Sequence, residues 1–405
     1  MIPVAANGKT ESGPVTIEYW TIFTGPDGKI MQEMVDTFNR EYNGKIKVNM
    51  SVIPAADYYV KMPLALKSGK GPDVGICHLD SLKNVLDQGV LLPIETKKMG
   101  IQDGDILPVA WKAGQVDGKQ YAIPLDVHPL VYFWNKKLFR EAGLDPEKIP
   151  ANREEFLAIA KALTKDTNKD GIVDQWGTAI PVGWPNFQIW YSIFFGNNGE
   201  LFSKDLKKAT FNSLAGKDAA QFMYDLVYKY KVSPENVQVD ADVDMFKRGT
   251  AAIEFNGIWM LQSYMNTSGL EFGAAAIPKL GNVKAAEWAG SHTLVLFKQQ
   301  ILNKDKIAAA QMLIKYLSSN SLTWASAGQV PARISVQSSD EFKAIPYMKA
   351  VGEGASIIVF PELFPKYGNA TGPIWEALNL ILTGVKEVNT AFTEAEKKSN
   401  DILAE

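Results

Sequence analysis

Residues 15–52 read VTIEYWTIFTGPDGKIMQEMVDTFNREYNGKIKVNMSV, and the fold class follows from this stretch. Its first six residues alternate apolar and polar side chains, which is typical of a half-buried strand. Ile30, Met34 and Phe38 then recur every four residues, which predicts an amphipathic helix that ends at Gly44. The closing KIKVNMSV returns to a period of two. The stretch therefore predicts a strand, a helix and a second strand.

The same alternation continues beyond this stretch. We expect a helix over residues 56–67, interrupted by Pro63, then a strand at PDVGICH and a short helix that ends at Gly89. Alternating strands and helices imply a mainly parallel sheet with helices on its faces. Ligands of such sheets lie beyond the carboxyl ends of the strands. The positions of interest are therefore residues 20–27 and 77–80.

A second α/β body is expected after residue 120. Residues 121–135 contain two apolar runs that are broken between Pro124 and Pro129, a pattern that suits a crossover between lobes. Asn152 followed by Glu155 resembles a capping box and predicts a helix start. Further strands are expected at 274–278 and 293–297, and further helices at 306–317, at 373–385 and at the C-terminus.

Composition narrows the class of protein. The chain has 405 residues and a net charge of −3, so no basic excess points to nucleic acid as a partner. It has one cysteine, Cys77, which excludes an internal disulfide. No apolar stretch approaches the roughly 20 residues that span a bilayer. Residues 1–14 lack the pattern of a signal peptide and are predicted to form a flexible tether.

Several segments, in this order, resemble the family 1 extracellular solute-binding proteins, the group that includes maltose-binding protein. They are VTIEYWTIF, GPDVGICHLDSLKNVLDQGVLLPI, DGKQYAIPLDVHPLVYFWNKKLFREAGLD, MFKRGTAAIEFNGIWMLQSYM, FGAAAIPKLG and GQVPARISV. The most specific parts are GPDV…D, YAIP…WNKKLFREAGL and F-K-x-G-x-A-A-I…N-G-x-W. Each part is a weak signal alone, but their order and spacing cover nearly the whole chain.

The resemblance implies a periplasmic-binding-protein-like fold of two α/β lobes with a hinge and a ligand cleft between them. The first lobe would comprise residues 15–125 and 283–333, the second residues 127–281 and 335–405, with hinge points near Asp126, Gly281 and Ile334. The resemblance also implies a monomer that works outside the cytoplasmic membrane, either in the periplasm or on a lipid anchor. Its partners would be an oligosaccharide and the permease subunits of an ATP-driven importer.

A carbohydrate site needs flat aromatic rings beside hydrogen-bonding side chains, because sugars combine apolar C–H faces with hydroxyl groups. Topology places Trp20, Phe23 and the loop of Trp288, Ser291 and His292 at the cleft edge. For Trp20 the alternative is a core position that caps the sheet.

The resemblance adds candidates position by position. Asp80 matches an aspartate that binds sugar hydroxyls, although it could instead cap the helix that begins at Ser81. Asp126 and His128 lie at or beside an acidic ligand position, where a hinge hydrogen bond is the alternative. Trp259 matches a stacking tryptophan and is the strongest candidate.

The remaining candidates carry similar alternatives. In VGWPNFQIWYSIFFGNNG, which resembles the stretch that supplies stacking aromatics, Trp184 and Asn186 lie in or beside a Gly/Pro loop. Trp190, Tyr191 and Phe194 have helical spacing and are predicted to be core. Asn256 is either a turn residue or a hydroxyl partner. Arg333 either forks across two hydroxyls or pairs with a carboxylate. Trp375, near a helix start, completes the set.

One segment suggests a structural metal. In DTNKDGIVD, the residues Asp166, Asn168, Asp170, Ile172 and Asp174 resemble the opening of a calcium loop, in which oxygen ligands alternate and Gly171 allows a sharp turn. The acidic residue expected at the twelfth position is absent. The alternative is an Asx-rich turn that leads into a strand.

Enzymatic interpretations have less support. The nucleophile elbow, the phosphate-binding loop, the dinucleotide fingerprint and the H-E-x-x-H zinc motif are all missing from the sequence. His78, His128, His292 and Cys77 lack metal spacing, and no cofactor is required. A glycoside hydrolase with two carboxylates remains the first alternative. A binding protein for a non-sugar solute, such as a polyamine, is the second.

Overall fold

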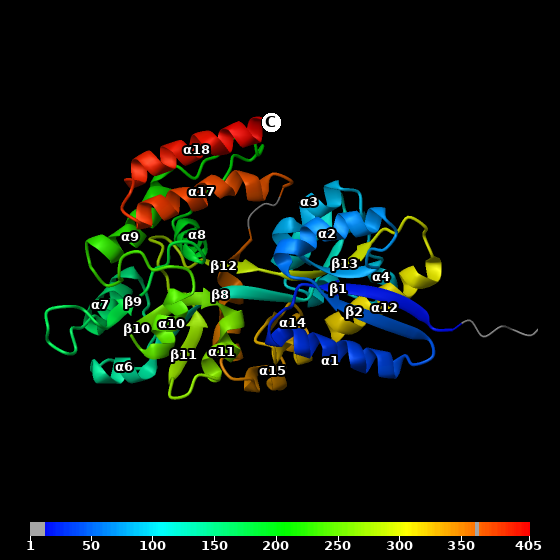
Figure 1. Ribbon diagram of the computed structural model, residues 1–405, viewed down its shortest axis with the longest axis horizontal. Coiled ribbons are helices and arrows are strands. Elements are labelled where there is room, and N and C mark those ends of the chain that lie inside the picture. Colours follow the sequence, from blue (N-terminus) through cyan, green and yellow to red (C-terminus); the bar gives the residue numbers. More distant parts are fainter. Residues whose placement is uncertain (1–12, 361–363) are drawn as a thin grey trace, which may run out of the picture.

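The computed structural model describes residues 13–360 and 364–405, and the chain forms two lobes (Figure 1). The first lobe is built on a six-stranded sheet and the second on a seven-stranded sheet. Helices pack on both sheets, which confirms the predicted α/β class. Residues 1–12 of the predicted tether lie outside the described residues. The first strand belongs to the first lobe, and the last helix belongs to the second.

The first sheet has the strand order β2-β1-β3-β13-β4, with β7 beside β13. Its strands are β1 (Val15–Thr21), β2 (Ile46–Val52), β3 (Val74–His78), β4 (Leu91–Leu92), β7 (Ala122–Pro124) and β13 (His292–Phe297). β1 pairs in parallel with β2 along its whole length and with β3 near its end. β13 joins from much later in the chain and runs antiparallel to β3. The carboxyl ends of β1 and β3 therefore meet at one edge, as the sequence predicts.

Helices cover this sheet and complete the first lobe. They are α1 (Pro26–Glu41), α2 (Ala55–Lys67), η1 (Leu79–Ser81), α3 (Leu82–Asp87), α4 (Thr96–Met99), η2 (Asp103–Asp105), α5 (Pro108–Ala113), α12 (Lys304–Ser319) and α13 (Ser321–Ala325). A hairpin of β5 (Gln115–Val116) and β6 (Lys119–Gln120) lies between α5 and β7. α2 continues through Pro63, contrary to the predicted interruption.

The second sheet has the order β15-β12-β8-β10-β9, and β11 and β14 also pair with β8. Its strands are β8 (Asp126–Asn135), β9 (Trp176–Thr178), β10 (Ala251–Gly257), β11 (Phe272–Ala276), β12 (Glu287–Gly290), β14 (Val330–Pro331) and β15 (Ile358–Val359). Every residue of β8 is buried. The break predicted between Pro124 and Pro129 is confined to Leu125, because β8 begins at Asp126 and continues through Pro129. Four other strands of this sheet pair with β8.

Helices surround the second sheet as well. They are α6 (Lys136–Glu141), α7 (Arg153–Leu163), α8 (Asn186–Gly196), α9 (Leu214–Tyr228), α10 (Ala241–Arg248), η3 (Ile258–Met260), α11 (Leu261–Met265), α14 (Ile334–Gln337), α15 (Asp340–Ala344), α16 (Met348–Gly352), η4 (Glu353–Ile357), α17 (Tyr367–Leu382) and α18 (Val388–Ala404). The predicted N-cap of α7 is confirmed, because the Asn152 side chain accepts a hydrogen bond from the backbone N–H of Glu155. None of the helices in the described part of the chain is long and apolar enough to span a membrane.

The chain passes between the two sheets at three places. The first crossing is at Asp126, where β7 gives way to β8. The second is at Ser291, beyond the boundary predicted at Gly281, because β12 pairs with β8 instead of joining the first sheet. The third is at β14, which comes after α13 of the first lobe and whose Val330 and Pro331 pair with the start of β8. All three crossings therefore lie against the first residues of β8.

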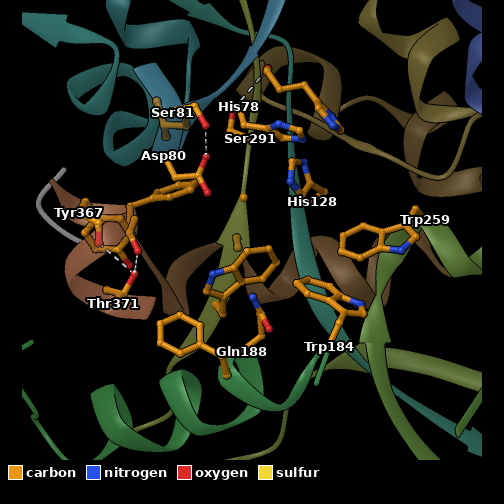
Figure 2. Close-up of a pocket in the computed structure, with 18 of the residues that line it drawn as sticks. His78, Asp80, Ser81, His128, Trp184, Gln188, Trp259, Ser291, Tyr367 and Thr371 are labelled. Carbon is orange, nitrogen blue, oxygen red and sulfur yellow. Dashed lines mark hydrogen bonds between the residues drawn. The ribbon is translucent and has the colours of Figure 1, made fainter. Parts of the chain in front are cut away.

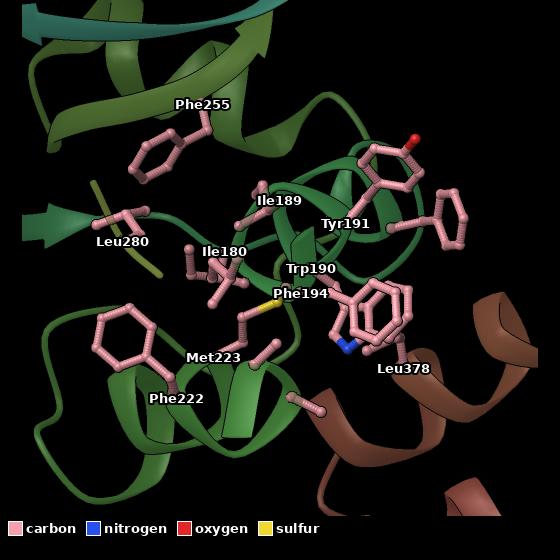
Figure 3. Packing of buried hydrophobic residues seen from close by; sticks show 14 of the residues in the cluster. Ile180, Ile189, Trp190, Tyr191, Phe194, Phe222, Met223, Phe255, Leu280 and Leu378 are labelled. Carbon is pink, nitrogen blue, oxygen red and sulfur yellow. The ribbon is translucent and has the colours of Figure 1, made fainter. Parts of the chain in front are cut away.

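Aromatic side chains fill the core of the second lobe (Figure 3). Trp190, Tyr191 and Phe194 of α8 are fully buried, which confirms their predicted core positions. The rings of Trp190 and Phe194 stack with centroids 4.6 Å apart. The indole N–H of Trp190 donates to the backbone oxygen of Gly216, so the polar edge of this buried ring is satisfied.

The loop considered for calcium binding forms a hydrogen-bonded turn. Asp166 accepts from the backbone N–H of Gly171 at 2.7 Å, and Asp170 accepts from that of Ile172 at 2.8 Å. Asp174 accepts from the backbone N–H of Thr167 at 3.0 Å. Within the described residues, the loop acids form no group of three whose oxygens lie within 4.8 Å of one another. These carboxylates therefore accept hydrogen bonds from the loop backbone, and calcium binding stays a prediction.

The calcium interpretation predicts a thermal response. Calcium added to EDTA-treated protein should raise the melting temperature, because a ligand that binds only the folded state stabilises it. Asp166→Ala should abolish the response, whereas Asp205→Ala, in another exposed turn of the same lobe, should retain it. Scanning fluorimetry checks both variants. A melting temperature that calcium leaves unchanged would leave the hydrogen-bonded turn as the only role of the loop.

Two acids are buried where α10 packs on β10, namely Asp242 on the helix and Glu254 on the strand. Glu254 is fully buried and accepts hydrogen bonds from the Tyr264 hydroxyl and, at 3.0 Å, from the Asn256 amide. Burial, with a further contribution from the charge of Asp242, raises the pKa of Glu254 from 4.5 to about 8. Burial likewise raises the pKa of Asp242 to about 7. Between the unfolded and folded pKa values, Glu254 and Asp242 are therefore protonated in the folded chain and ionised in the unfolded chain.

Because of these raised pKa values, we predict that the free energy of unfolding falls as the pH rises from about 5 to about 8. The contribution of Glu254 is complete below its unfolded pKa and is lost as the pH rises through about 8. Glu254→Gln, which cannot titrate, should flatten this fall. The control Glu154→Gln, an exposed residue of α7, should not change it. Urea unfolding midpoints at pH 5, 6.5 and 8 measure the slope, and equal slopes for wild type and Glu254→Gln would contradict the assignment.

Candidate functional site

A cavity of about 590 Å³ lies between the two lobes (Figure 2). This volume falls within the roughly 300–1,000 Å³ typical of small-molecule sites. Both lobes and the crossing segments contribute to its wall: Asp27, His78, Leu79, Asp80, Ser81, Asn84, His128, Trp184, Phe187, Gln188, Trp259, Trp288, Ala289, Gly290, Ser291, His292, Gln329, Phe360, Tyr367, Gly368, Thr371 and Trp375. The cavity thus lies where the strand ends of the two sheets face each other.

Four half-buried tryptophans form the aromatic side of the cavity. The ring of Trp184 lies 5.5 Å from that of Trp259, 5.8 Å from that of Trp288 and 6.4 Å from that of Trp375. The Trp375 ring in turn stacks on Phe187, with centroids 4.9 Å apart and 12° between the planes. Four elements of the second lobe therefore bring their rings together around one space.

Local backbone shape sets the position of Trp259. β10 ends at Gly257, and η3 follows at once. A Cβ atom on Gly257 would lie 2.0 Å from the Trp259 ring, so only glycine lets the indole lie across the backbone at this point. The N-G-x-W sequence therefore places the ring at the cavity. Trp184 follows Gly183, whose φ of +102° is also a glycine conformation.

The first lobe supplies carboxylates. Asp80 lies in η1 at the end of β3, and its side chain is exposed to the cavity (Figure 2). Its predicted alternative role as a helix cap is not realised, because no side chain caps α3. The Ser81 hydroxyl donates to Asp80 at 3.2 Å. Asp27 reaches the same cavity from the first turn of α1 and accepts from the Gly28 backbone N–H at 2.9 Å.

Histidines line the floor between the lobes, and a buried acid holds two of them. Asp126 accepts hydrogen bonds from Nδ1 of His128 at 3.2 Å and from Nδ1 of His292 at 2.8 Å. It also accepts from the backbone N–H of His292 at 2.9 Å and from the indole of Trp324 at 2.7 Å. These bonds link β8, β13 and α13 at a single carboxylate.

The charge state of this cluster follows from its surroundings. Burial alone would raise the pKa of Asp126, but the charge of His292 and the histidine hydrogen bonds outweigh burial and hold the pKa below its ordinary range. Burial, with the charge of His292, lowers the pKa of His128 to about 4. Burial also lowers the pKa of His78. At neutral pH, Asp126 is therefore ionised, and His78 and His128 are uncharged.

The same cluster bears on metal binding. Asp126, His128 and His292 form the group in the described structure whose ligand atoms all lie within 4.8 Å of one another. Their short contacts are the N–H···O hydrogen bonds already described, so the arrangement is satisfied without an ion. The close approach of these three side chains is therefore explained by hydrogen bonds, and it does not itself indicate a zinc site.

Two amides on the wall have unused hydrogen-bonding capacity. Gln188 and Gln329 are 3% and 1% exposed, and within the described chain their Oε1 atoms have no hydrogen-bond partner. Buried polar groups are normally paired. Both oxygens are shielded from solvent, so a ligand hydroxyl would pair with them only after these side chains rotate.

Eight of the predicted residues line the cavity: Asp80, His128, Trp184, Trp259, Trp288, Ser291, His292 and Trp375. Three others lie outside the wall. Phe23 is buried, with its ring 4.9 Å from that of His292 and 4.6 Å from that of Trp324. Trp20 packs on the apolar cores of the first lobe, which was its alternative role. Asp126 is fully buried and acts through the histidines.

Three further candidates do not line the cavity, because their side chains have partners elsewhere. Asn186 is buried and donates to the Asn379 side chain at 2.8 Å. The Asn256 amide donates to the buried carboxylate of Glu254, two residues earlier on β10. Arg333 forms an ion pair with Asp105 at 2.6 Å and donates to the Ser318 backbone, so its carboxylate alternative is the one realised.

The structure also adds wall residues that the prediction did not select: Asp27, His78, Asn84, Phe187, Gln188, Gln329, Phe360, Tyr367 and Thr371. Asp27 and His78 lie inside the two strand-end segments that topology had marked, so a signal existed for both. Tyr367 and Thr371 had none, because their helix was expected to begin at Pro373 and instead begins at Tyr367.

Two proteins of similar sequence are named for the oligosaccharides that they bind. The arabinooligosaccharide-binding protein of Halalkalibacterium halodurans is 25% identical over 356 residues, which cover 83% of this chain and 75% of the relative. The maltodextrin-binding protein of Bacillus subtilis is 24% identical over 393 residues, which cover 88% of each chain. Both relatives align along most of their length.

Solved structures share the fold. The cyclic α-maltosyl-1,6-maltose binding protein from Arthrobacter globiformis matches with a TM-score of 0.81 at 23% identity, over 96% of this chain and 99% of that chain. The sugar-binding protein of Xanthomonas citri matches with a TM-score of 0.83 at 22% identity, over 96% and 98%. The model of a family described as bacterial extracellular solute-binding protein matches residues 24–322. Since this match spans most of the chain, the protein belongs to the bacterial extracellular solute-binding proteins.

Proposed function

We propose that the protein binds an oligosaccharide between its lobes, without altering it chemically, and delivers it to the permease of an ATP-driven importer. The observation that carries this proposal is the group of four tryptophans that face the carboxylates and amides of one cavity. Aromatic faces receive the C–H faces of sugar rings, and the polar wall receives the hydroxyls. Relatives named for arabinooligosaccharide and maltodextrin binding support the same class of ligand.

Hinge closure is the expected motion, and periplasmic binding proteins are a standard example of it. The tryptophans belong to the second lobe, whereas Asp27 and Asp80 belong to the first. A ligand that contacts both walls binds the closed form better and so shifts the population toward it. In the present conformation, α17 contacts η1, so the lobes already touch across the mouth of the cavity.

The setting follows from the family. We expect a monomer that acts outside the cytoplasmic membrane, in the periplasm or on a lipid anchor. A relative from Streptococcus pneumoniae is named a solute-binding lipoprotein of a maltooligosaccharide transporter, which supports an anchored form. The permease subunits would be the protein partners.

Tryptophan fluorescence tests the proposed ligand class. Maltotriose, arabinotriose, cellotriose, galactotriose, mannotriose and spermidine are titrated into the protein, and the sugars are then assayed for new reducing ends. At least one sugar should change the emission with saturation at micromolar concentrations and should remain intact. New reducing ends would favour the glycoside hydrolase alternative. A response to spermidine alone would favour the polyamine alternative.

Trp259→Ala should weaken binding of the responding sugar by about 2 kcal/mol or more, as expected for a buried aromatic anchor. This loss corresponds to roughly 30-fold in Kd. Isothermal titration calorimetry measures it, and circular dichroism checks that the variant is folded. Trp111→Ala is the matched control, because Trp111 lies in α5, outside the cavity wall, and its loss should leave Kd unchanged. Equal affinities for wild type and Trp259→Ala would contradict the proposal.

A further inference from the structure

The two carboxylates on the cavity wall, those of Asp27 and Asp80, have no lysine or arginine beside them among the lining residues in the described part of the chain. Both aspartates accept hydrogen bonds from uncharged donors, Asp27 from the Gly28 backbone N–H and Asp80 from the Ser81 hydroxyl. Arg333, the cation that sequence placed here, is paired with Asp105 outside the wall.

His128 and His292 each direct Nδ1 to Asp126, so the charge of His292 is paired with this buried carboxylate. An ionised carboxylate only accepts hydrogen bonds, so Nδ1 of His128 and Nδ1 of His292 must both carry the proton that points to Asp126. In an uncharged ring, Nε2 is then a hydrogen-bond acceptor. Asp126 lies two residues before His128 and pairs directly with His292, and it therefore fixes the tautomer of both rings.

The remaining polar groups on the wall are uncharged. Asn84, Ser81 and Thr371 contribute an amide and two hydroxyls, and the buried amides of Gln188 and Gln329 lie in the same wall. A sugar hydroxyl both donates and accepts, so it can satisfy carboxylates, imidazole nitrogens and amides alike. A sugar carboxylate only accepts, and it would lose its hydration here beside two aspartates without gaining a lysine or arginine partner.

We propose that this cavity selects uncharged oligosaccharides and rejects those whose bound residues carry carboxylates, such as uronic acids. The inference rests on the proposed function, and it names the class of sugar. Asp27 and Asp80 are the residues that determine this specificity, because they would face an incoming carboxylate with like charge. Asp126 is a positioning residue, since it touches the histidines and not the cavity.

Paired ligands test the proposal. Maltotriose, cellotriose, galactotriose and mannotriose are each compared by calorimetry with the counterpart whose C6 alcohols have been oxidised to carboxylates. The best neutral sugar should bind at least tenfold more tightly than its oxidised counterpart. An oxidised series that binds as tightly as the neutral series, or more tightly, would overturn the specificity and leave the proposed function standing. If no sugar of either series binds and arabinotriose does not bind either, the proposed function fails, and the specificity fails with it.

Charge-neutral variants locate the effect. Asp80→Asn and Asp27→Asn should each narrow the ratio of the two affinities by strengthening binding of the oxidised sugar. Asp36→Asn is the matched control, because it removes the same charge from an exposed position on α1 without touching the cavity. A ratio that narrows equally in Asp36→Asn would assign the selectivity to the overall charge of the protein and overturn the role of the wall.

Discussion

A single ionised carboxylate, that of Asp126, holds the centre of this molecule together. It is fully buried, and it accepts hydrogen bonds from His128 on β8, from His292 on β13 and from Trp324 on α13. The strands that contribute belong to different sheets, so this one side chain joins the lobes from within. A buried charge is costly unless donors surround it, and here four donors do so. The region where the lobes meet is therefore polar and precisely oriented, whereas the two cores on either side are apolar.

Glycines make the cavity surface possible at two points near this centre. A Cβ atom on Gly257 would overlap the Trp259 ring, and one on Gly290 would lie 2.1 Å from Nε2 of His128. Both rings consequently lie close against the backbone and leave the space above them open. The aromatic and polar sides of the cavity are thus defined as much by missing side chains as by those present.

Local patterns were sufficient where the physics is local. The alternation in residues 15–52 predicted β1, α1 and β2 because their apolar faces are set by side-chain periodicity. Topology then marked the two segments that contain Asp27, His78 and Asp80, since neighbouring parallel strands end at the same edge of a sheet. The resemblance placed Trp259. By contrast, Arg333 pairs with Asp105, which is far away in the sequence. Tyr367 likewise lines the cavity together with wall residues from distant parts of the chain. No short-range pattern encodes such contacts, because long side chains and helix packing decide them in three dimensions.

The position of the two ends of the fold has a practical consequence. β1 opens the first lobe and α18 closes the second, so the first and last elements move with different halves of the molecule (Figure 1). Any rotation about the Asp126 region would change the spacing between these elements. A pair of fluorophores, one near each end of the chain, would convert sugar capture into a change in energy transfer, which makes this scaffold a ready basis for an optical biosensor.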